Sequence, residues 1–250
     1  MPAETSLQRR SAARTAVVWD ALREVLEAAA GPDGVAEVVD IGGGTGGLAV
    51  RAAGLGHRVT VVDPSPDALA ILARRAEESG VADRVTALQG DLGSLADATL
   101  VAAGSADVVL CHGVLEIVED VAPALAALAA TLRPGGTLSL LVGQRHAAVV
   151  TRAMAGHFGQ ALAILEGDDP ATTAGGRRFT ADEIATLLDA GGLDVETMHA
   201  VRVFVDLVPS SLVDLEPGAA ERLVELEQAV ARRPEYLPLG TQLHVLATRR

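Results

Sequence analysis

The chain has 250 residues, of which 49% are hydrophobic and only 2% aromatic, so its core must be built from aliphatic side chains. Its formal net charge is −13 and all 20 basic residues are arginines, which argues against broad polyanion binding but leaves room for a local basic groove. A single cysteine excludes an internal disulfide or an all-cysteine zinc site. With neither an apolar leader nor a membrane-length apolar segment, we expect a soluble, cytoplasmic protein without a metal.

Helices and strands are predicted to alternate through the first half of the chain. A helix over residues 7–29 precedes a glycine- and proline-rich break, and a β-branched strand follows over 35–41. The elements expected next are helix 47–54, strand 58–62, helix 66–79, strands 84–88 and 106–111, helix 120–132 and strand 137–142. This alternation predicts right-handed crossovers and a parallel sheet, which binds ligands at the carboxyl ends of its strands.

The last hundred residues do not continue the regular alternation of strand and helix patterns. Residues 144–178 are rich in glycine and less periodic, and we expect them to form an inserted helix and loop that covers the site. Thr180 and Glu183 have the spacing of a capping box, which predicts a helix over 180–190. The remaining predictions are a strand over 193–205, a helix over 210–233 and a strand over 241–248. We expect one domain, 1–250, with a helical cap (1–30), a ligand-binding core (35–143), the insertion (144–178) and a C-terminal part (179–250) that completes the sheet.

The strongest local signal is the glycine-rich sequence D-I-G-G-G-T-G-G at residues 40–47, between a predicted strand and a predicted helix. Glycine allows a sharp turn and a close approach to a ligand, and the helix that follows offers unpaired N–H groups. Gly42, Gly44 and Gly47 also have the G-x-G-x-x-G spacing of dinucleotide sites. The loop alone therefore fits a nicotinamide or flavin enzyme, a methyltransferase, or an ordinary tight turn.

Three acidic residues at strand ends help to decide which ligand the glycine-rich loop binds. Asp40 precedes the first glycine by two residues, where a carboxylate would repel a pyrophosphate but attract the ammonium group of a methionine-bearing ligand. Asp63 can accept both ribose hydroxyls of an adenosine, although a helix N-cap is the alternative. Asp91 can accept the adenine amino group while Leu92 packs against the ring, with a plain turn as the alternative.

Taken together, these motifs resemble those of a known family. D-I-G-G-G-T-G (40–46), V-V-D (61–63), Q-G-D-L (89–92) and L-R-P-G-G-T-L (132–138) are similar to the motifs of class I S-adenosylmethionine-dependent methyltransferases. The resemblance implies an α/β, Rossmann-like fold with a mostly parallel seven-stranded sheet and an antiparallel C-terminal strand. It also implies S-adenosyl-L-methionine as the cofactor.

A closer resemblance, to the tRNA 5-carboxymethoxyuridine methyltransferases, extends over nearly the whole chain. Its motifs are V-W-D-A-L (18–22), C-H-G-V-L-E (111–116), V-R-V-F-V-D (201–206) and E-Y-L-P-L-G (235–240). Members of that family convert a carboxymethoxy group on the wobble uridine to its methyl ester, which implies a tRNA acceptor. The chain departs from the family at Asp168 and Asp169, where lysines are expected, and at Thr241-Gln242, where a basic and aromatic pair is expected.

The family resemblance also assigns cofactor contacts. Arg14 matches an arginine that binds the methionine carboxylate, and His112 matches a histidine just after the fourth strand. Without the resemblance, Arg14 fits a solvated helix face and His112 a capped strand end. The remaining matched positions are Gly42 and Gly43 in the loop, Asp63 at the ribose, and Leu92 and Gly93 at the adenine. Asp40, Gly44 and Asp91 complete the predicted cofactor site.

The acceptor is predicted from the chemistry of methyl transfer. A carboxylate is already nucleophilic, so the lack of an obvious base in the motifs is compatible with methyl-ester formation, and no catalytic residue is predicted. Arginine can anchor such a carboxylate. Arg202 is the candidate, because strand alternation would place Arg202, Phe204 and Asp206 on one face, with a simple Arg202–Asp206 pair as the alternative. Tyr236 and His244 are further substrate-binding candidates.

Three functions stay open at this point. They are a tRNA wobble-uridine methyltransferase, a small-molecule O- or N-methyltransferase, and a regulator that only binds S-adenosylmethionine. Asp40 disfavours a fourth, an NAD-dependent oxidoreductase. The sequence indicates neither the acceptor atom nor the oligomeric state.

Overall fold

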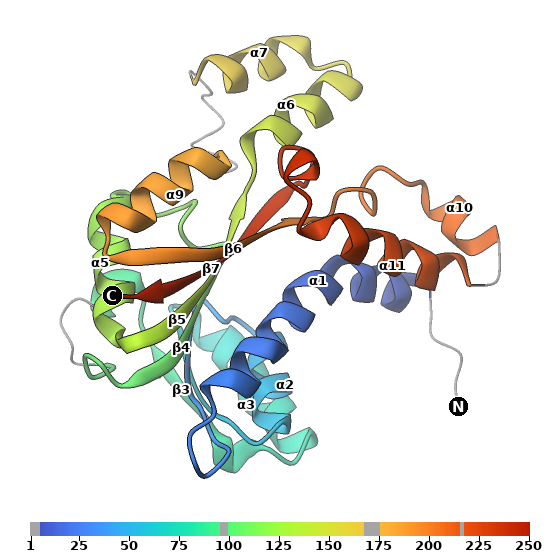
Figure 1. Cartoon of the computed structure of the whole chain (residues 1–250). Helices are drawn as coiled ribbons and strands as arrows, with labels where there is room; N and C mark the ends of the chain where they lie inside the picture. Colours follow the sequence, from blue (N-terminus) through green and yellow to red (C-terminus); the bar gives the residue numbers. More distant parts are fainter. Residues whose placement is uncertain (1–5, 96–99, 168–175, 216–217) are drawn as a thin grey trace. The chain divides into compact units, whose positions relative to one another are not determined.

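A computed structural model describes residues 6–95, 100–167, 176–215 and 218–250 of the chain (Figure 1). Seven strands form one sheet in the order β3-β2-β1-β4-β5-β7-β6. They are β1 (Glu37–Ile41), β2 (Arg58–Asp63), β3 (Val85–Gln89), β4 (Ala106–His112), β5 (Leu132–Gly143), β6 (Leu193–Val201) and β7 (Gln242–Arg249). The predicted α/β fold, with parallel strands and one antiparallel C-terminal strand, is confirmed.

The four helices predicted in the first half of the chain lie close to their predicted positions, and one short helix, α4, was not predicted. In chain order, the helices are α1 (Ser6–Ala29), α2 (Gly47–Gly54), α3 (Pro66–Glu78), α4 (Leu92–Leu95), α5 (Val121–Thr131), α6 (Arg145–Met154), α7 (Phe158–Glu166), α9 (Ala181–Ala190), α10 (Ser210–Leu215) and α11 (Ala219–Ala231). Two short 3-10 turns span Ala82–Arg84 and Pro234–Tyr236. Part of the predicted insertion, 168–175, lies outside the described residues.

The chain divides into two compact units that do not follow the sequence segments. A larger unit contains residues 22–141, 184–196 and 245–250, and a smaller unit contains residues 1–21, 142–183 and 197–244. The larger unit holds most of the predicted ligand-binding core. The smaller unit holds the predicted insertion and most of the C-terminal part. A single domain over 1–250 stays a prediction.

β1, β2, β4 and β5 are largely buried and rich in valine and leucine, as expected for strands covered on both faces, whereas β3, at the edge of the sheet, has no buried residue. β1 pairs with β2 and with β4, β2 pairs with β3, and β4 pairs with β5. Ile41, at the end of β1, lies opposite Val62 on one side and Cys111 on the other. The residues that end or follow these strands therefore emerge together at one edge of the sheet.

The R-P-G-G turn lies within β5 as an irregularity of the ladder. The pairing between β4 and β5 jumps from Ala106 opposite Leu132 to Val108 opposite Thr137. Arg133 in the turn pairs with Asp107 at 2.7 Å, and Asp107 accepts the backbone N–H of Glu37 at 2.8 Å. One arginine–aspartate pair thus ties together the starts of β1, β4 and β5.

The predicted capping box of α9 is confirmed. The Thr180 N–H donates to Oε2 of Glu183 at 2.8 Å, and the Glu183 N–H donates to Oγ1 of Thr180 at 3.2 Å. The single helix predicted over 210–233 is wrong, because the structure has two helices, α10 and α11. The second helix, α11, begins after Gly218, which has a left-handed backbone with a φ of 78°. Glycine adopts this conformation readily, whereas it is unfavourable for other residues.

The strand predicted over 193–205 is also wrong at its end, because β6 stops at Val201. Arg202 has a φ of 61°, and no other non-glycine residue in the described ranges has a positive φ. Left-handed backbone cannot continue a strand. Strand alternation therefore does not place Arg202, Phe204 and Asp206 on one face, although Val203 and Val205 are buried as predicted.

No helix in the described part of the chain is long and apolar enough to cross a membrane. The described side chains include no group of three or more His, Cys, Asp or Glu that could hold a metal ion.

Candidate functional site

A cavity of about 740 Å³ opens at the carboxyl edge of the parallel strands in the larger unit. This volume suits a nucleoside-sized ligand. Its lining comes from the ends of β1, β2 and β4, the residues after β3, and the start of α5: Ile41, Gly42, Asp63, Pro64, Asp91, Leu92, Gly93, His112, Gly113, Val114, Ile117, Val118, Glu119, Asp120, Pro123, Ala124 and Ala127. Six residues predicted from the sequence are among them: Gly42, Asp63, Asp91, Leu92, Gly93 and His112.

The glycine loop has no room for side chains at two positions. A Cβ on Gly42, which has a φ of 69°, would lie 2.3 Å from Cγ2 of Val114. On Gly43, a Cβ would lie 2.5 Å from Oδ2 of Asp40 and 2.8 Å from Cγ1 of Val61. The loop therefore packs directly onto the buried carboxylate of Asp40, and the successive glycines are a steric requirement of this fold.

Asp63 holds the loop in place while lining the cavity. Its Oδ2 accepts the backbone N–H of Gly44 at 2.8 Å, and its Oδ1 accepts the backbone N–H of Ser65 at 2.9 Å. The helix-cap alternative is wrong, because α3 is capped by Ser65, whose Oγ accepts the N–H of Ala68. Each carboxylate oxygen keeps a further lone pair that can accept a ligand hydroxyl.

Asp40 is almost fully buried at the end of β1 (4% exposed) and does not line the cavity itself. Burial, together with the nearby negative charge of Asp63, raises the pKa of Asp40 to about 7. The carboxyl group is therefore partly protonated at neutral pH, and a cation placed over the loop would favour its ionised form.

Asp91 forms the turn that was its alternative interpretation, while its adenine-binding role stays a prediction. Its Oδ1 accepts the N–H of Ser94 at 2.9 Å, and its own N–H donates to Oγ of Ser94 at 2.8 Å, so Asp91 forms the turn that starts α4. The same turn places Asp91, the buried Leu92 and Gly93 on the cavity wall.

His112 contributes a neutral polar group to the cavity. Burial lowers its pKa to about 4, and its Nε2 lies 2.9 Å from Oγ of Ser139. The neighbouring Cys111 is fully buried, and its pKa is raised to about 12 by burial and by the carboxylates of Glu116 and Asp40. A protonated, inaccessible thiol is not a nucleophile.

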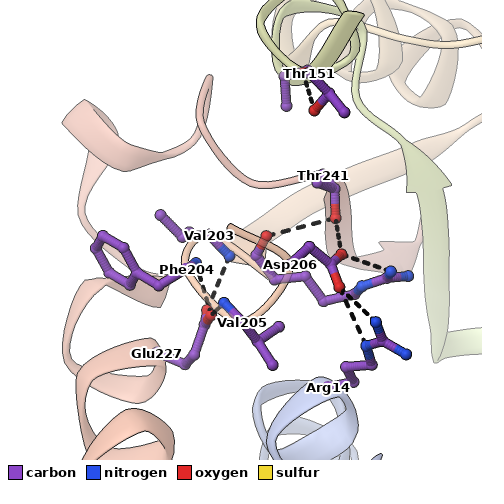
Figure 2. A network of polar contacts seen from close by, with 10 residues as sticks. Arg14, Thr151, Val203, Phe204, Val205, Asp206, Glu227 and Thr241 are labelled. Carbon is purple, nitrogen blue, oxygen red and sulfur yellow. Dashed lines mark hydrogen bonds and ion pairs between the residues drawn. The ribbon is translucent and has the colours of Figure 1, made fainter. Parts of the chain in front are cut away.

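The other predicted residues belong to the smaller unit. Arg14 donates from Nε and Nη2 to Oδ1 of Asp206, at 3.1 and 2.9 Å (Figure 2). Arg202 pairs with Oδ2 of the same carboxylate at 2.5 Å. Tyr236 lies edge-on to Phe204, with ring centres 6.1 Å apart. His244 is fully buried and stacks on His199 at 5.3 Å, so its role in substrate binding stays a prediction.

Sequence reasoning missed the apolar part of the cavity wall. Val114, Ile117, Val118 and Pro123 line it, and Asp120 caps α5 by accepting the N–H of Ala122 at 3.1 Å. The available signal was position: these residues connect the end of a parallel strand to the next helix, which is where open α/β sheets bind ligands.

Comparison with known proteins agrees with this geometry. A sequence profile described as "Methyltransferase domain" matches residues 39–138. The chain is 30% identical over 237 residues to the tRNA 5-carboxymethoxyuridine methyltransferase of Escherichia coli (strain K12), covering 94% of this chain and 87% of that protein. It is 34% identical over 174 residues to a ubiquinone biosynthesis O-methyltransferase of Methylobacterium sp. (strain 4-46), covering 66% and 63%. The crystal structure of the [4+2]-cyclase SpnF shares the fold, with a TM-score of 0.62, 21% identity, and 92% and 80% coverage.

The fold, the cavity and the matched domain define an S-adenosylmethionine-dependent methyltransferase of class I. Within this class, the chain belongs to the family that includes the Escherichia coli tRNA 5-carboxymethoxyuridine methyltransferase. It is therefore an enzyme that uses S-adenosyl-L-methionine, and the oxidoreductase and regulator alternatives are set aside.

Proposed function

We propose that this methyltransferase forms a methyl ester on a carboxylate, and that the acceptor is the carboxymethoxy group of a tRNA wobble uridine. The observation that carries the proposal is the extent of the similarity. The relative named for this activity matches 94% of the chain, including both compact units. The ubiquinone O-methyltransferase relative matches 66%. A tRNA acceptor also implies that the enzyme works in the cytoplasm.

We propose these roles for the residues around the cofactor. Asp63 accepts the ribose hydroxyls, Asp91 accepts the adenine amino group, and Leu92 and Gly93 form the surface on which the adenine packs. The backbone of Gly42, Gly43 and Gly44 follows the methionine portion, and His112 supplies a neutral polar contact. The Asp40 carboxylate beneath the loop attracts the ammonium group, and Arg14 pairs with the carboxylate of the cofactor.

The role of Asp40 predicts a pH dependence. Its pKa in the unliganded protein is about 7, and a bound ammonium group favours ionisation, so binding should release a proton. We expect affinity for S-adenosylmethionine to weaken as the pH falls below about 7, by at most tenfold per pH unit. Calorimetric titration in buffers of different ionisation enthalpy measures both the affinity for S-adenosylmethionine and the number of protons released on binding. In Asp40→Asn the affinity should be lower and nearly independent of pH. A pH-independent affinity in the wild-type enzyme would contradict this role.

We propose that Arg202 anchors the acceptor carboxylate. Two guanidinium groups, of Arg14 and Arg202, share the single carboxylate of Asp206, so this group carries a net positive charge. Within the described residues, the buried Nε of Arg202 has no hydrogen-bond partner. An unmet charged donor of this kind favours a carboxylate ligand. A carboxylate acceptor needs no general base. The protein therefore has only to hold the carboxylate in line with the sulfonium methyl group.

Replacing Arg202 by alanine should therefore raise the KM for the acceptor about tenfold or more, as expected for the loss of a charged hydrogen bond. Affinity for S-adenosylmethionine should stay within about twofold, because Arg202 does not line the cofactor cavity and is assigned no contact with the cofactor. Arg222→Ala, an exposed arginine of the same unit, is the matched control. Unchanged acceptor kinetics in Arg202→Ala would remove Arg202 from the site.

The acceptor itself is tested in cells. Mass spectrometry of wobble-position nucleosides should show a methyl-ester uridine in the source strain. In a deletion of this gene, the ester should disappear and its free acid should accumulate. If the ester persists in the deletion strain, or if the strain makes neither nucleoside, the enzyme methylates another acceptor.

The second candidate is a small-molecule O- or N-methyltransferase, which the acidic balance favours. That balance is uneven, however. The larger unit has nine arginines and 19 acidic residues, whereas the smaller unit has 11 arginines and 14 acidic residues. A polyanion is therefore repelled less by the smaller unit, which also contains Arg14 and Arg202.

A further inference from the structure

The turn that follows β6 is an unusual place for an arginine. Arg202 has a left-handed backbone, with a φ of 61°, and its Cβ makes that conformation unfavourable. Glycine adopts the same conformation readily and would end β6 equally well. Something other than local preference must therefore hold Arg202 in this conformation.

The carboxylate of Glu227 fixes the backbone directly after Arg202. Glu227 lies on α11 and is fully buried. It accepts three successive backbone N–H groups: Val203 on Oε2 at 2.9 Å, and Phe204 and Val205 on Oε1 at 2.8 Å each (Figure 2). Consecutive N–H groups that converge on one anion form a concave anion site, which here is filled by the protein's own side chain.

Other contacts fix Arg202 from its remaining sides. Its carbonyl oxygen accepts the N–H of Thr241 at 3.4 Å, and its guanidinium pairs with Asp206 at 2.5 Å. The hydroxyl of Thr241 also reaches Oδ2 of Asp206 at 3.4 Å. The backbone of the turn is thus held by Glu227 and the side chain by Asp206, which leaves the guanidinium pre-oriented.

We propose that Glu227 is a positioning residue for the methyl acceptor, because it holds the turn that presents Arg202. The inference rests on the proposed anchoring role of Arg202. Burying a carboxylate is costly unless its hydrogen bonds are satisfied, and the three N–H groups that satisfy Glu227 come from the residues directly after Arg202. The structure retains the buried acid together with the strained arginine, which fits a requirement for the arginine side chain at that place.

Glu227→Gln tests this proposal at nearly constant shape. The amide places an NH2 group opposite a backbone N–H, so at least one of the three bonds is lost. We expect the KM for the acceptor to rise about tenfold, with kcat within about twofold of wild type and unchanged affinity for S-adenosylmethionine. The control is Glu225→Gln, which removes the same charge from an exposed position on α11 and should match wild type.

A double-mutant cycle separates positioning from a general structural role. In the Arg202→Ala background, Glu227→Gln should change the acceptor KM less than about twofold, because the anchor is already gone. The same rise in KM with and without Arg202 would overturn the proposal. If Glu227→Gln fails to fold, Arg202→Gly is added to relieve the strain. Recovery of the wild-type urea midpoint in the double variant supports the proposal, and no recovery overturns it.

A crystal structure of Glu227→Gln gives a readout that does not depend on the acceptor. We expect Arg202 to leave the left-handed region and to lose its pairing with Asp206, whereas an unchanged φ at Arg202 overturns the proposal. If wild-type enzyme fails to methylate tRNA carrying the free acid, the proposed acceptor fails instead. The conformation of Arg202 then still decides whether Glu227 positions it.

Discussion

Replacing Gly43 by alanine is expected to reduce the affinity for S-adenosylmethionine by tenfold to a hundredfold. The added methyl group would lie 2.5 Å from Oδ2 of Asp40 and 2.8 Å from Cγ1 of Val61. Both neighbours are buried, on β1 and β2, so either the loop lifts or the carboxylate moves. Such overpacking costs about 1–3 kcal/mol. Calorimetric titration with the cofactor measures the loss, and thermal unfolding shows how much of the strain the free protein carries.

Gly54 provides the matched control for this substitution. It lies at the end of α2, its φ is not positive, and a Cβ there would meet nothing within 4 Å. Gly54→Ala should therefore bind the cofactor as wild type does. Affinity within threefold of wild type in Gly43→Ala would contradict the close packing of the loop on Asp40.

Asp63→Asn is expected to weaken cofactor binding by a similar or larger factor. The carboxylate holds the N–H groups of Gly44 and Ser65 and is the proposed acceptor for the ribose hydroxyls. Hydrogen bonds to a charged group contribute about 1.5–3 kcal/mol each, and an asparagine keeps only one acceptor oxygen. The loss should therefore reach about a hundredfold, measured by the same titration.

Asp63→Asn has a second expected effect that tests its link to Asp40. Removing the charge of Asp63 removes one of the two causes that raise the pKa of Asp40. The pH below which binding weakens should therefore move down. Asp67→Asn, an exposed acid in the first turn of α3, should change neither quantity. Normal affinity in Asp63→Asn would exclude Asp63 from the cofactor site.

The larger unit was predictable because its elements follow local rules. Alternating strand and helix patterns predicted its parallel sheet. The capping box of Thr180 and Glu183, which lies in the smaller unit, is a local rule of the same kind and predicted the start of α9. The carboxyl edge of such a sheet collects the residues at strand ends, so the pattern of elements was enough to group Gly42 and Asp63 in one site, and the family resemblance added His112. Steric contacts such as that of Gly43 on Asp40 follow from the same strand-to-glycine junction.

The smaller unit was less predictable because its conformation depends on distant residues. Nothing near Arg202 in the sequence indicates a left-handed residue, since the turn is held by Glu227 on a later helix. Asp206 likewise joins Arg202 to Arg14, near the other end of the chain. The division of the predicted helix 210–233 had a local signal, because Pro217-Gly218 is a common breaker.

The most direct test of the central claim uses purified enzyme, S-adenosylmethionine labelled in its methyl group, and tRNA that carries the free carboxymethoxyuridine. After digestion, mass spectrometry of the nucleosides should find the label in the methyl ester of the wobble uridine, in proportion to the S-adenosylhomocysteine formed. If the tRNA receives no label although the enzyme binds S-adenosylmethionine, the tRNA assignment is contradicted. A small-molecule acceptor is then the alternative.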